Sequence, residues 1–459
     1  MRIILVTNGF PPTAFGGVEV YSSDLAKGLA ARGHEITVFC RETSDSRSDH
    51  EVIDEVLDGI RVVRVVNDFK ALNHFRQTYS DENVERLFDD WLVKLSPDLI
   101  HFHHLIALSA SLPEVANRRH IPYVTTLHDF WPICHRVNLI DRSQHICPGP
   151  LAGGVCRPCV FGSPRKDLLW WALAFAKKVL PPDLRQRLRQ RITRQDYRVP
   201  VVDISRTEVD FDLRHSIFRQ NILASRRLYA PSAYVRDQFA RNGFPAERME
   251  VFPLGISPLQ GISSSKIHDG RPVRPHTIRL AYVGSLIPVK GADVLLRAMA
   301  KARGNNLSLD VYGRQDIEPA SYVTRLKRLA RNDQRIVFRG VFTPNQRSQI
   351  YAEMDALIIP SVAPETFSLV AREALSAGKP VIASAIGALP EIIQDGVNGY
   401  LFEPGDESLL AAILSRLSRQ PESLFELKCP GPVEILSVAE HTTRLEAVYA
   451  DVSSASVLR

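Results

Sequence analysis

The chain has 459 residues, which is long enough for two or three domains with sizeable cores. Its 45% hydrophobic and 24% charged residues are those of an ordinary globular protein. The formal net charge of +6 favours anionic partners such as phosphate-bearing ligands or an anionic membrane surface. No recognised nucleic-acid motif accompanies this charge, so we expect no nucleic acid among the partners.

Two features lead us to expect a cytoplasmic protein. No stretch reaches the roughly 18 apolar residues of a membrane span. Residues 2–7 are predicted to form a strand rather than a signal peptide, because the apolar run is short and no small-residue cleavage site follows it.

The N-terminal half alternates strands and helices, as in a doubly wound sheet. Expected strands span residues 2–7, 35–39, 59–66, 99–103, 123–127, 226–232 and 251–256, and expected helices span residues 83–95, 105–117 and 234–242. A further helix is expected between Gly17 and Gly33. Just before it, Gly16 and Gly17 allow close backbone approach to a phosphate or a sugar, although a glycine turn without a ligand is the alternative.

A segment of unusual composition covers residues 164–198. It joins an apolar stretch containing Trp170 and Trp171 to an arginine-rich amphipathic helix after Asp183. Such a helix can lie on an anionic membrane, or it can pack on the N-terminal domain with a solvated basic face. The Pro-, Gly- and Ser-rich residues 261–276 form the best linker, so residues 1–260 are expected to make up the N-terminal domain.

The C-terminal half is again α/β, with a predicted domain over residues 277–432 followed by a helix and tail over residues 433–459. Expected strands span residues 279–283, 307–313, 335–341, 356–359, 381–383 and 400–402, and expected helices span residues 293–302, 322–331, 344–354, 368–377, 409–417 and 433–449.

Residues 356–384 form the most informative unit, a strand, a loop, a helix and a second strand. The loop brings Glu365 to the carboxyl edge of a parallel sheet, where such sheets bind ligands. Backbone N–H groups at Phe367, Ser368 and Leu369 open the helix and can attract a phosphate, and Glu373 can reach a sugar hydroxyl beside it. The alternative is a plain βαβ unit with two solvated glutamates.

The spacing of Glu365 and Glu373, followed by Gly378-Lys379-Pro380-Val381, resembles the donor-site signature of the retaining nucleotide-sugar glycosyltransferases of family 4. Further motifs of that family occur in order along nearly the whole chain: Phe10-Pro11-Pro12 with Gly16-Gly17, Arg32-Gly33-His34, Ala230-Pro231-Ser232, Pro253-Leu254-Gly255 and Val283-Gly284 with Lys290-Gly291. The resemblance implies the GT-B fold, in which two Rossmann-like domains face each other across a cleft. It also allows a C-terminal helix that returns to the N-terminal domain.

The resemblance also assigns roles. Glu365 would contact the transferred sugar, Glu373 the ribose hydroxyls, and His128 would lie near the anomeric carbon. The Gly16-Gly17 loop would face the donor, and Lys290, in the loop that begins at Gly284, would offset the charge of the departing diphosphate. Transfer would retain the anomeric configuration and need no cofactor.

One position departs from the family pattern. Ser285 stands five residues before Lys290, where an arginine is common. Either Arg314, Arg339 or Arg372 compensates, or the diphosphate is less strongly stabilised; we count Gly284, Ser285 and Arg339 among the donor-binding candidates. Ser368 replaces a common glycine but still offers its backbone N–H.

Four of the six cysteines cluster in the loop 134–159, namely Cys134, Cys147, Cys156 and Cys159. In a cytosolic protein this pattern suggests a structural zinc site, with free buried thiols or a redox pair as alternatives. The histidines at positions 101, 103 and 104 are expected to serve packing and hydrogen bonding rather than metal binding.

The sequence therefore predicts an enzyme that moves a hexose-type sugar from a UDP- or GDP-sugar to a polysaccharide or lipid-linked glycan at the inner membrane face. A sugar-phosphate or soluble-glycoside synthase on the same fold is one alternative. A non-catalytic nucleotide-sugar-binding relative is another.

Overall fold

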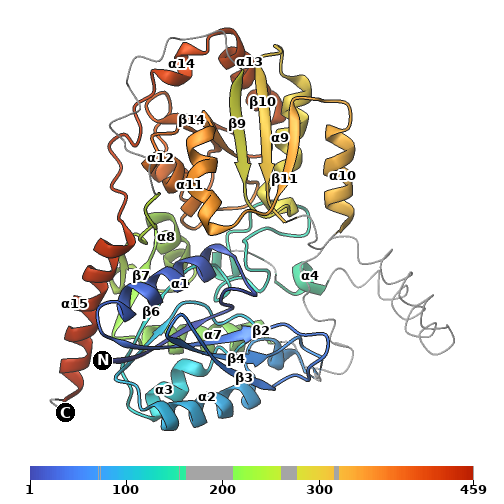
Figure 1. The fold of residues 1–459 in the computed structure, drawn as a ribbon. Coiled ribbons are helices and arrows are strands. Elements are labelled where there is room, and N and C mark those ends of the chain that lie inside the picture. Colours follow the sequence, from blue (N-terminus) through green and yellow to red (C-terminus); the bar gives the residue numbers. More distant parts are fainter. Residues whose placement is uncertain are drawn as a thin grey trace.

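The computed structural model describes residues 1–70, 72, 74–152, 154, 156–161, 210–259, 277–314 and 320–457. These residues form two α/β domains, one above the other in Figure 1. The predicted basic insertion 164–198 and the linker 261–276 lie outside the described residues. Among the described residues, no helix combines the length and apolar composition needed to cross a bilayer.

The N-terminal domain contains a sheet of strand order β3-β4-β2-β1-β5-β6-β7-β8. Its strands are β1 (Arg2–Thr7), β2 (Glu35–Glu42), β3 (Val52–Leu57), β4 (Ile60–Val66), β5 (Leu99–Phe102), β6 (Tyr123–Thr126), β7 (Arg227–Ala230) and β8 (Met249–Val251). All neighbours are parallel except β3 and β4, which form an antiparallel hairpin at one edge. The sequence did not predict β3, because its residues are half-exposed or exposed and lack a continuous apolar run.

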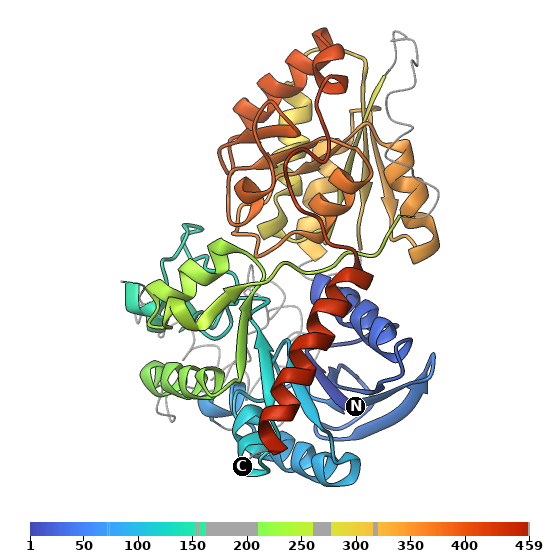
Figure 2. The same ribbon diagram turned by 90° about the vertical axis from the view of Figure 1, so that its left-hand side faces the viewer.

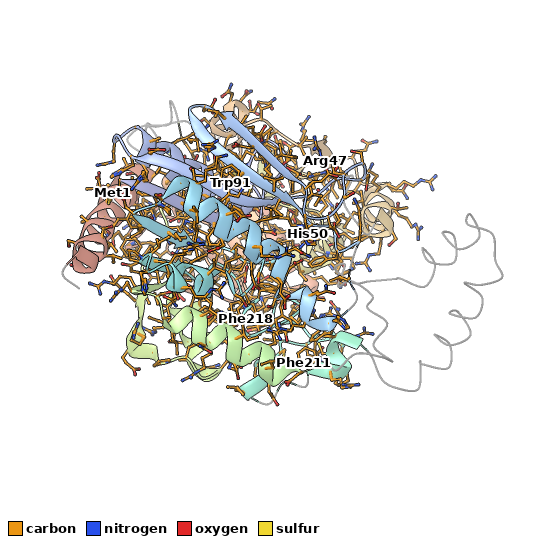
Figure 3. The ribbon with its side chains drawn as sticks, turned by 90° about the horizontal axis from the view of Figure 1, so that it is seen from below. Met1, Arg47, His50, Trp91, Phe211 and Phe218 are labelled. Carbon is orange, nitrogen blue, oxygen red and sulfur yellow. The ribbon has the colours of Figure 1, made fainter. Side chains whose placement is uncertain are left out.

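Helices cover both faces of this sheet. They are α1 (Gly17–Ala30), α2 (Glu82–Leu95), α3 (Leu112–Arg118), α4 (Cys156–Phe161), α7 (Phe211–Leu223) and α8 (Ala233–Arg241). Alternate residues of β1 serve the two faces: Ile4 packs in the core with α2 and α7, whereas Leu5 packs in the core with α1. Figure 3 shows the face carrying Trp91 of α2 and Phe218 of α7.

Two sequence predictions in this domain were partly wrong. The helix expected over 105–117 begins only at Leu112, because Ala107 has a positive φ and Pro113 occupies the first turn. The strand expected over 251–256 ends at Val251, before Pro253. The helix α7 was missed altogether.

The C-terminal domain contains a fully parallel sheet of order β11-β10-β9-β12-β13-β14. Its strands are β9 (Ile278–Val283), β10 (Leu307–Tyr312), β11 (Ile336–Gly340), β12 (Ala356–Ile359), β13 (Val381–Ser384) and β14 (Gly399–Phe402). The main helices are α9 (Ala292–Lys301), α10 (Ala320–Ala330), α11 (Pro344–Glu353), α12 (Leu369–Ser376), α13 (Glu407–Arg419) and α14 (Glu422–Phe425). The strand order reverses between β9 and β12, and the loops at such a switch point bound a ligand crevice.

The last helix, α15 (Val438–Val457), leaves the C-terminal domain and packs along the N-terminal domain (Figure 2). It starts five residues later than expected, where Ser437 and Glu440 exchange side-chain-to-backbone hydrogen bonds. Tyr449 of this helix is fully buried in the N-terminal core. The predicted return of the C-terminal helix is therefore confirmed.

Candidate active site between the two domains

Two loops meet at the switch point of the C-terminal sheet. One follows β9 and contains the short 3₁₀ helix η7 (Pro288–Lys290), and the other follows β12. The backbone N–H of Val362 donates to the carbonyl of Val289 at 3.0 Å. Gly291 has a φ of +67°, and a Cβ there would lie 1.8 Å from the carbonyl oxygen of Pro360. Only glycine permits this approach, so the Lys-Gly pair of the sequence holds the two loops together.

The approach pairs Lys290 with Glu365. The ammonium of Lys290 lies 2.7 Å from Oε1 of Glu365, which also accepts from the hydroxyl of Ser361 at 2.5 Å. The side chain of Glu365 is 11% exposed and that of Lys290 is 37% exposed. The structure thus brings together two of the predicted catalytic residues, and it adds Ser361, which the sequence did not single out.

The backbone of Glu365 is fixed from the other side by the loop after β13. Gly387 has a φ of +65°, and a Cβ there would lie 2.3 Å from the carbonyl oxygen of Glu365. The N–H of Ala388 donates to that same carbonyl at 2.8 Å. The carboxylate is therefore presented on a constrained loop.

The helix α12 begins at Leu369, with Ser368 as its N-cap residue. Ser368 has a φ of 59°, in the left-handed region that glycine prefers, which explains why a glycine suits this position. The Ser368 side chain makes no capping hydrogen bond. The first backbone N–H groups of α12 therefore remain available beside Phe367, as the sequence predicted.

Glu373, one turn further along α12, is buried and held by two partners from α11. Its Oε1 lies 3.1 Å from Nη1 of Arg347, and its Oε2 accepts from the hydroxyl of Tyr351 at 2.6 Å. Burial raises the pKa of this carboxyl, while Arg347 opposes the shift. The sequence did not single out Arg347 and Tyr351, although their i, i+4 spacing on a predicted helix places them on one face.

Two of the residues proposed to replace the missing arginine, Arg339 and Arg372, already have partners of their own. Arg339 is on the edge strand β11, where its Nε donates to Asp310 at 2.7 Å. Arg372 stacks on the ring of Phe367 at 3.4 Å and donates to the Phe367 carbonyl, and burial lowers its pKa to about 9. Ser285 is exposed, next to Gly284. In the described part of the chain, neither guanidinium forms an ion pair with Glu365.

The N-terminal domain contacts the loops and the helix start of this site directly. A Cβ added to Gly17 would lie 3.7 Å from Leu369, so the Gly16-Gly17 loop faces the start of α12, as the resemblance implied. The hydroxyl of Ser232 donates to the carbonyl of Thr366 at 2.7 Å.

A carboxylate also bridges the domains. Glu391, in the 3₁₀ helix η8 (Leu389–Glu391), accepts from the backbone N–H groups of Ala233 and Tyr234 at 3.0 and 2.6 Å. These groups open α8 of the N-terminal domain, so a side chain of one domain caps a helix of the other.

His128 follows β6 on the N-terminal side of the cleft and is 5% exposed. Its Nε2 lies 3.0 Å from Nδ1 of His103, and its ring lies 5.1 Å from that of Tyr21. Burial and the neighbouring His103 hold the pKa of His128 well below its usual value, so the ring is neutral. Within the described ranges, no hydrogen bond joins His128 to Lys290 or Glu365.

All four clustered cysteines line one cavity of the N-terminal domain, together with Ile133, His135 and Arg136. They are free thiols, and the N–H of Gly149 donates to Sγ of Cys147 at 3.4 Å. Burial raises the pKa of the Cys156 thiol to about 12. No three histidine, cysteine or acidic side chains in the described ranges are grouped as metal ligands. The four thiols share one cavity, and zinc binding stays a prediction.

Sequence comparison decides the family. The profile described as Glycosyltransferase Family 4 matches residues 15–153, and the profile described as Glycosyl transferases group 1 matches residues 277–420. The chain belongs to the family 4 glycosyltransferases.

Similar proteins agree with this assignment. The D-inositol 3-phosphate glycosyltransferase of Mycolicibacterium smegmatis is 35% identical over 32% of this chain and 34% of its own length. This chain thus spans about a third of that relative's length in the match. The D-inositol 3-phosphate glycosyltransferase of Corynebacterium diphtheriae is 24% identical over 96% of this chain and 91% of its own length.

The fold has a solved counterpart. The structure of Anabaena Alr3699/HepE in complex with UDP and glucose superposes with a TM-score of 0.60 and 18% identity, covering 98% of this chain and 99% of that one. The predicted GT-B fold, with two Rossmann-like domains, is therefore confirmed.

Proposed function

We propose that this family 4 glycosyltransferase moves a hexose-type sugar from a UDP- or GDP-sugar to a polysaccharide or lipid-linked glycan, with retention of configuration and without a catalytic cofactor. The pair formed by Lys290 and Glu365 beside the open start of α12 carries the proposal. It places a cation, a fixed carboxylate and free N–H groups at one switch point, facing the other domain. The UDP and glucose bound to Alr3699/HepE support a nucleotide-sugar donor.

The charges of Lys290, Glu365 and the start of α12 indicate the role of each group. Cleavage of the donor leaves a nucleoside diphosphate whose negative charge grows in the transition state. Lys290 and the N–H groups at the start of α12 are positive groups that can receive it. Glu365, freed from Lys290 by the incoming diphosphate, can then accept hydroxyls of the sugar.

Glu373 suits the ribose. A carboxylate accepts two vicinal hydroxyls well, and Arg347 and Tyr351 fix the orientation of this one. His128 is neutral and lies on the opposite wall, so it can exchange a hydrogen bond with the sugar without adding charge.

The acceptor is inferred from the distribution of charge. The net charge of +6 and the basic stretch 164–198 suit an anionic membrane surface, and hence a lipid-linked acceptor at the cytoplasmic face of the inner membrane. A soluble-glycoside or sugar-phosphate synthase has no need of that stretch. Binding to anionic liposomes at low salt tests this part, and failure to bind would favour a soluble acceptor.

A donor screen tests the activity itself. UDP-, GDP- and ADP-sugars are compared for their effect on the melting temperature, and those that stabilise the protein are then tested for hydrolysis. We expect one nucleotide class to stabilise the protein and its sugar to be released. Stabilisation without release or transfer would indicate the non-catalytic alternative, and no stabilisation at all would contradict the donor site.

A further inference from the structure

A buried cluster of aromatic and histidine rings backs His128. His101 and His103 are two residues apart at the end of β5 and point to the same face of the sheet. Tyr21 of α1 packs against both His103 and His128, with ring centroids 5.5 and 5.1 Å apart. All of these side chains are less than 6% exposed.

His103 contacts His128 through one nitrogen only. Its Nδ1 lies 3.0 Å from Nε2 of His128, whereas its Nε2 is buried without a hydrogen-bond partner in the described part of the chain. Burial lowers the pKa of both rings well below its usual value, so each carries one proton.

The unpartnered nitrogen decides where those protons lie. If His128 donated from Nε2, the proton of His103 would sit on its own Nε2 and form a buried donor without an acceptor. If His103 donates from Nδ1, its Nε2 is left as a bare acceptor. Orphaned buried donors are rarer in proteins than under-used acceptors, so the second arrangement is favoured.

We propose that His103 is a positioning residue that donates from Nδ1 to Nε2 of His128 and thereby holds His128 as the tautomer protonated on Nδ1. The Nδ1–H is then the only donor that His128 offers a ligand. This inference rests on the proposed function, in which His128 faces the sugar.

The ring of His103 is itself held in place from α15. It stacks on His101 with centroids 3.8 Å apart. Nδ1 of His101 lies 2.5 Å from the hydroxyl of Tyr449, and its Nε2 lies 2.8 Å from the hydroxyl of Thr126. A second contact ties α15 to the cluster, because the hydroxyl of Tyr21 lies 2.7 Å from Nε2 of His441. The C-terminal helix therefore completes the support of a residue in the cleft.

The tautomer can be read directly. In protein labelled with ¹⁵N-histidine, long-range proton–nitrogen correlation distinguishes a protonated from a bare ring nitrogen, and a His128→Asn variant assigns the signals. We expect protonated Nδ1 and bare Nε2 on His128. A His128 protonated on Nε2 in the wild-type protein would overturn the inference. This measurement needs no substrate, so it stands even if the proposed activity fails.

Two substitutions separate positioning from packing. His103→Asn keeps a polar group where Nδ1 lies, whereas His103→Leu removes it. We expect His103→Leu to lower kcat by about tenfold to a hundredfold with little change in the donor KM, and His103→Asn to recover most of that loss. Equal losses in both variants, with an unchanged His128 tautomer, would show that His103 serves packing alone.

Tyr449→Phe tests the outer support without disturbing the ring stack. We expect a smaller fall in kcat in the same direction, with the fold intact by circular dichroism. Unchanged kcat and unchanged His128 signals in this variant would show that α15 does not support the His103 ring.

Discussion

The ammonium of Lys290 and the carboxylate of Glu365 lie 2.7 Å apart although they are 75 residues apart in the chain. The contact joins the two loops at the switch point of the C-terminal sheet. Glu365 is largely buried and Lys290 is partly exposed, and their contact orients both groups before a donor arrives. Such preorganisation is what electrostatic catalysis requires.

Replacing Lys290 with alanine should abolish most transfer while the fold survives. The pair is partly exposed, so its loss should change the free energy of unfolding by at most about 1 kcal/mol. The loss of its charge from the transition state should lower kcat/KM by about 10²- to 10³-fold. Steady-state kinetics and urea denaturation measure the two effects.

Lys301→Ala is the matched control, because Lys301 is also a partly exposed lysine paired with a glutamate in this domain. It should leave turnover unchanged. Normal turnover in Lys290→Ala would refute the assignment of this site.

Glu373→Gln should weaken the binding of the nucleoside diphosphate. The amide keeps the size of the carboxylate, but it accepts hydroxyls less strongly and leaves Arg347 without its charge partner. We expect at least a tenfold rise in Kd by calorimetry and a stability loss of roughly 1–3 kcal/mol.

A second substitution, at Arg347, separates the effect on stability from the effect on binding. Arg347→Met in the Glu373→Gln background should restore part of the lost stability but none of the affinity, since no buried charge is then left unpaired. Wild-type affinity in Glu373→Gln would show that the ribose is bound elsewhere.

The contact between the Glu391 carboxylate and the start of α8 should help to hold the two domains together. Glu391→Lys places a positive charge against the N–H groups that open α8, so the contact turns repulsive. The contact is exposed, and we expect a shift of about 1 kcal/mol. Spin labels on the two domains should report a longer mean separation in Glu391→Lys and no change in Glu403→Lys. Identical distance distributions in both variants would show that Glu391 does not hold the two domains together.

Much of this site was predictable because its signals are local. A strand, a loop with Glu365, a helix start and a second strand follow one another within 29 residues, and parallel topology dictates which edge they share. Lys290 and Gly291 were predicted because they belong to a motif of the family that the sequence resembles. Arg347 and Glu391 were not, because their importance comes from contacts with residues 26 and 158 positions away, which no local pattern encodes.

Two predictions of secondary structure were wrong for similar reasons. The edge strand β3 is stabilised by pairing with β4 rather than by burial, so its exposed positions hide it. The helix expected from Leu105 was shortened by a backbone conformation at Ala107 that apolar spacing does not reveal.

Zinc content tests the cysteine cluster. If the four thiols that line one cavity bind a metal, the protein purified without chelators should hold about one zinc ion per chain by elemental analysis. Cys147→Ser should lose it and melt at a lower temperature, whereas Cys429→Ser, outside the cluster, should retain it. Substoichiometric zinc in the wild type would leave the cysteines as free thiols.

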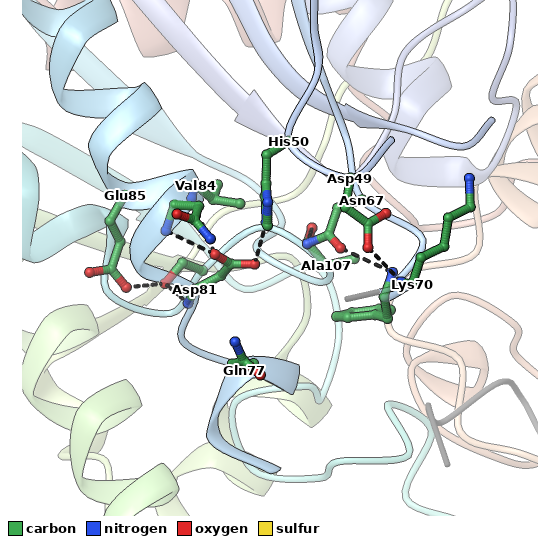
Figure 4. A network of polar contacts seen from close by, with 12 residues as sticks. Asp49, His50, Asn67, Lys70, Gln77, Asp81, Val84, Glu85 and Ala107 are labelled. Atoms are coloured by element: carbon green, nitrogen blue, oxygen red, sulfur yellow. Dashed lines mark hydrogen bonds and ion pairs between the residues drawn. The ribbon is translucent and has the colours of Figure 1, made fainter. Parts of the chain in front are cut away.

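The contact between His50 and Asp81 predicts a pH-dependent stability of the N-terminal domain. Asp81 caps α2 by accepting from the N–H groups of Asn83 and Val84, and its other oxygen lies 2.9 Å from Nε2 of His50 (Figure 4). This hydrogen bond raises the pKa of His50 above its ordinary value of 6.5. The folded protein therefore binds the proton more tightly than the unfolded chain.

The stabilisation is fully present below pH 6.5 and is lost as the pH rises through the raised pKa of His50. His50→Asn cannot titrate, and asparagine tolerates the φ of 73° at this position. The difference in unfolding free energy between wild type and His50→Asn should be roughly 0.5–1 kcal/mol larger at pH 5.5 than at pH 8.5. Urea denaturation at both pH values measures it, with His145→Asn as a control for an exposed histidine. A difference that is constant with pH would mean that His50 has the same pKa in the folded and unfolded protein, so that its contact with Asp81 does not favour the charged ring.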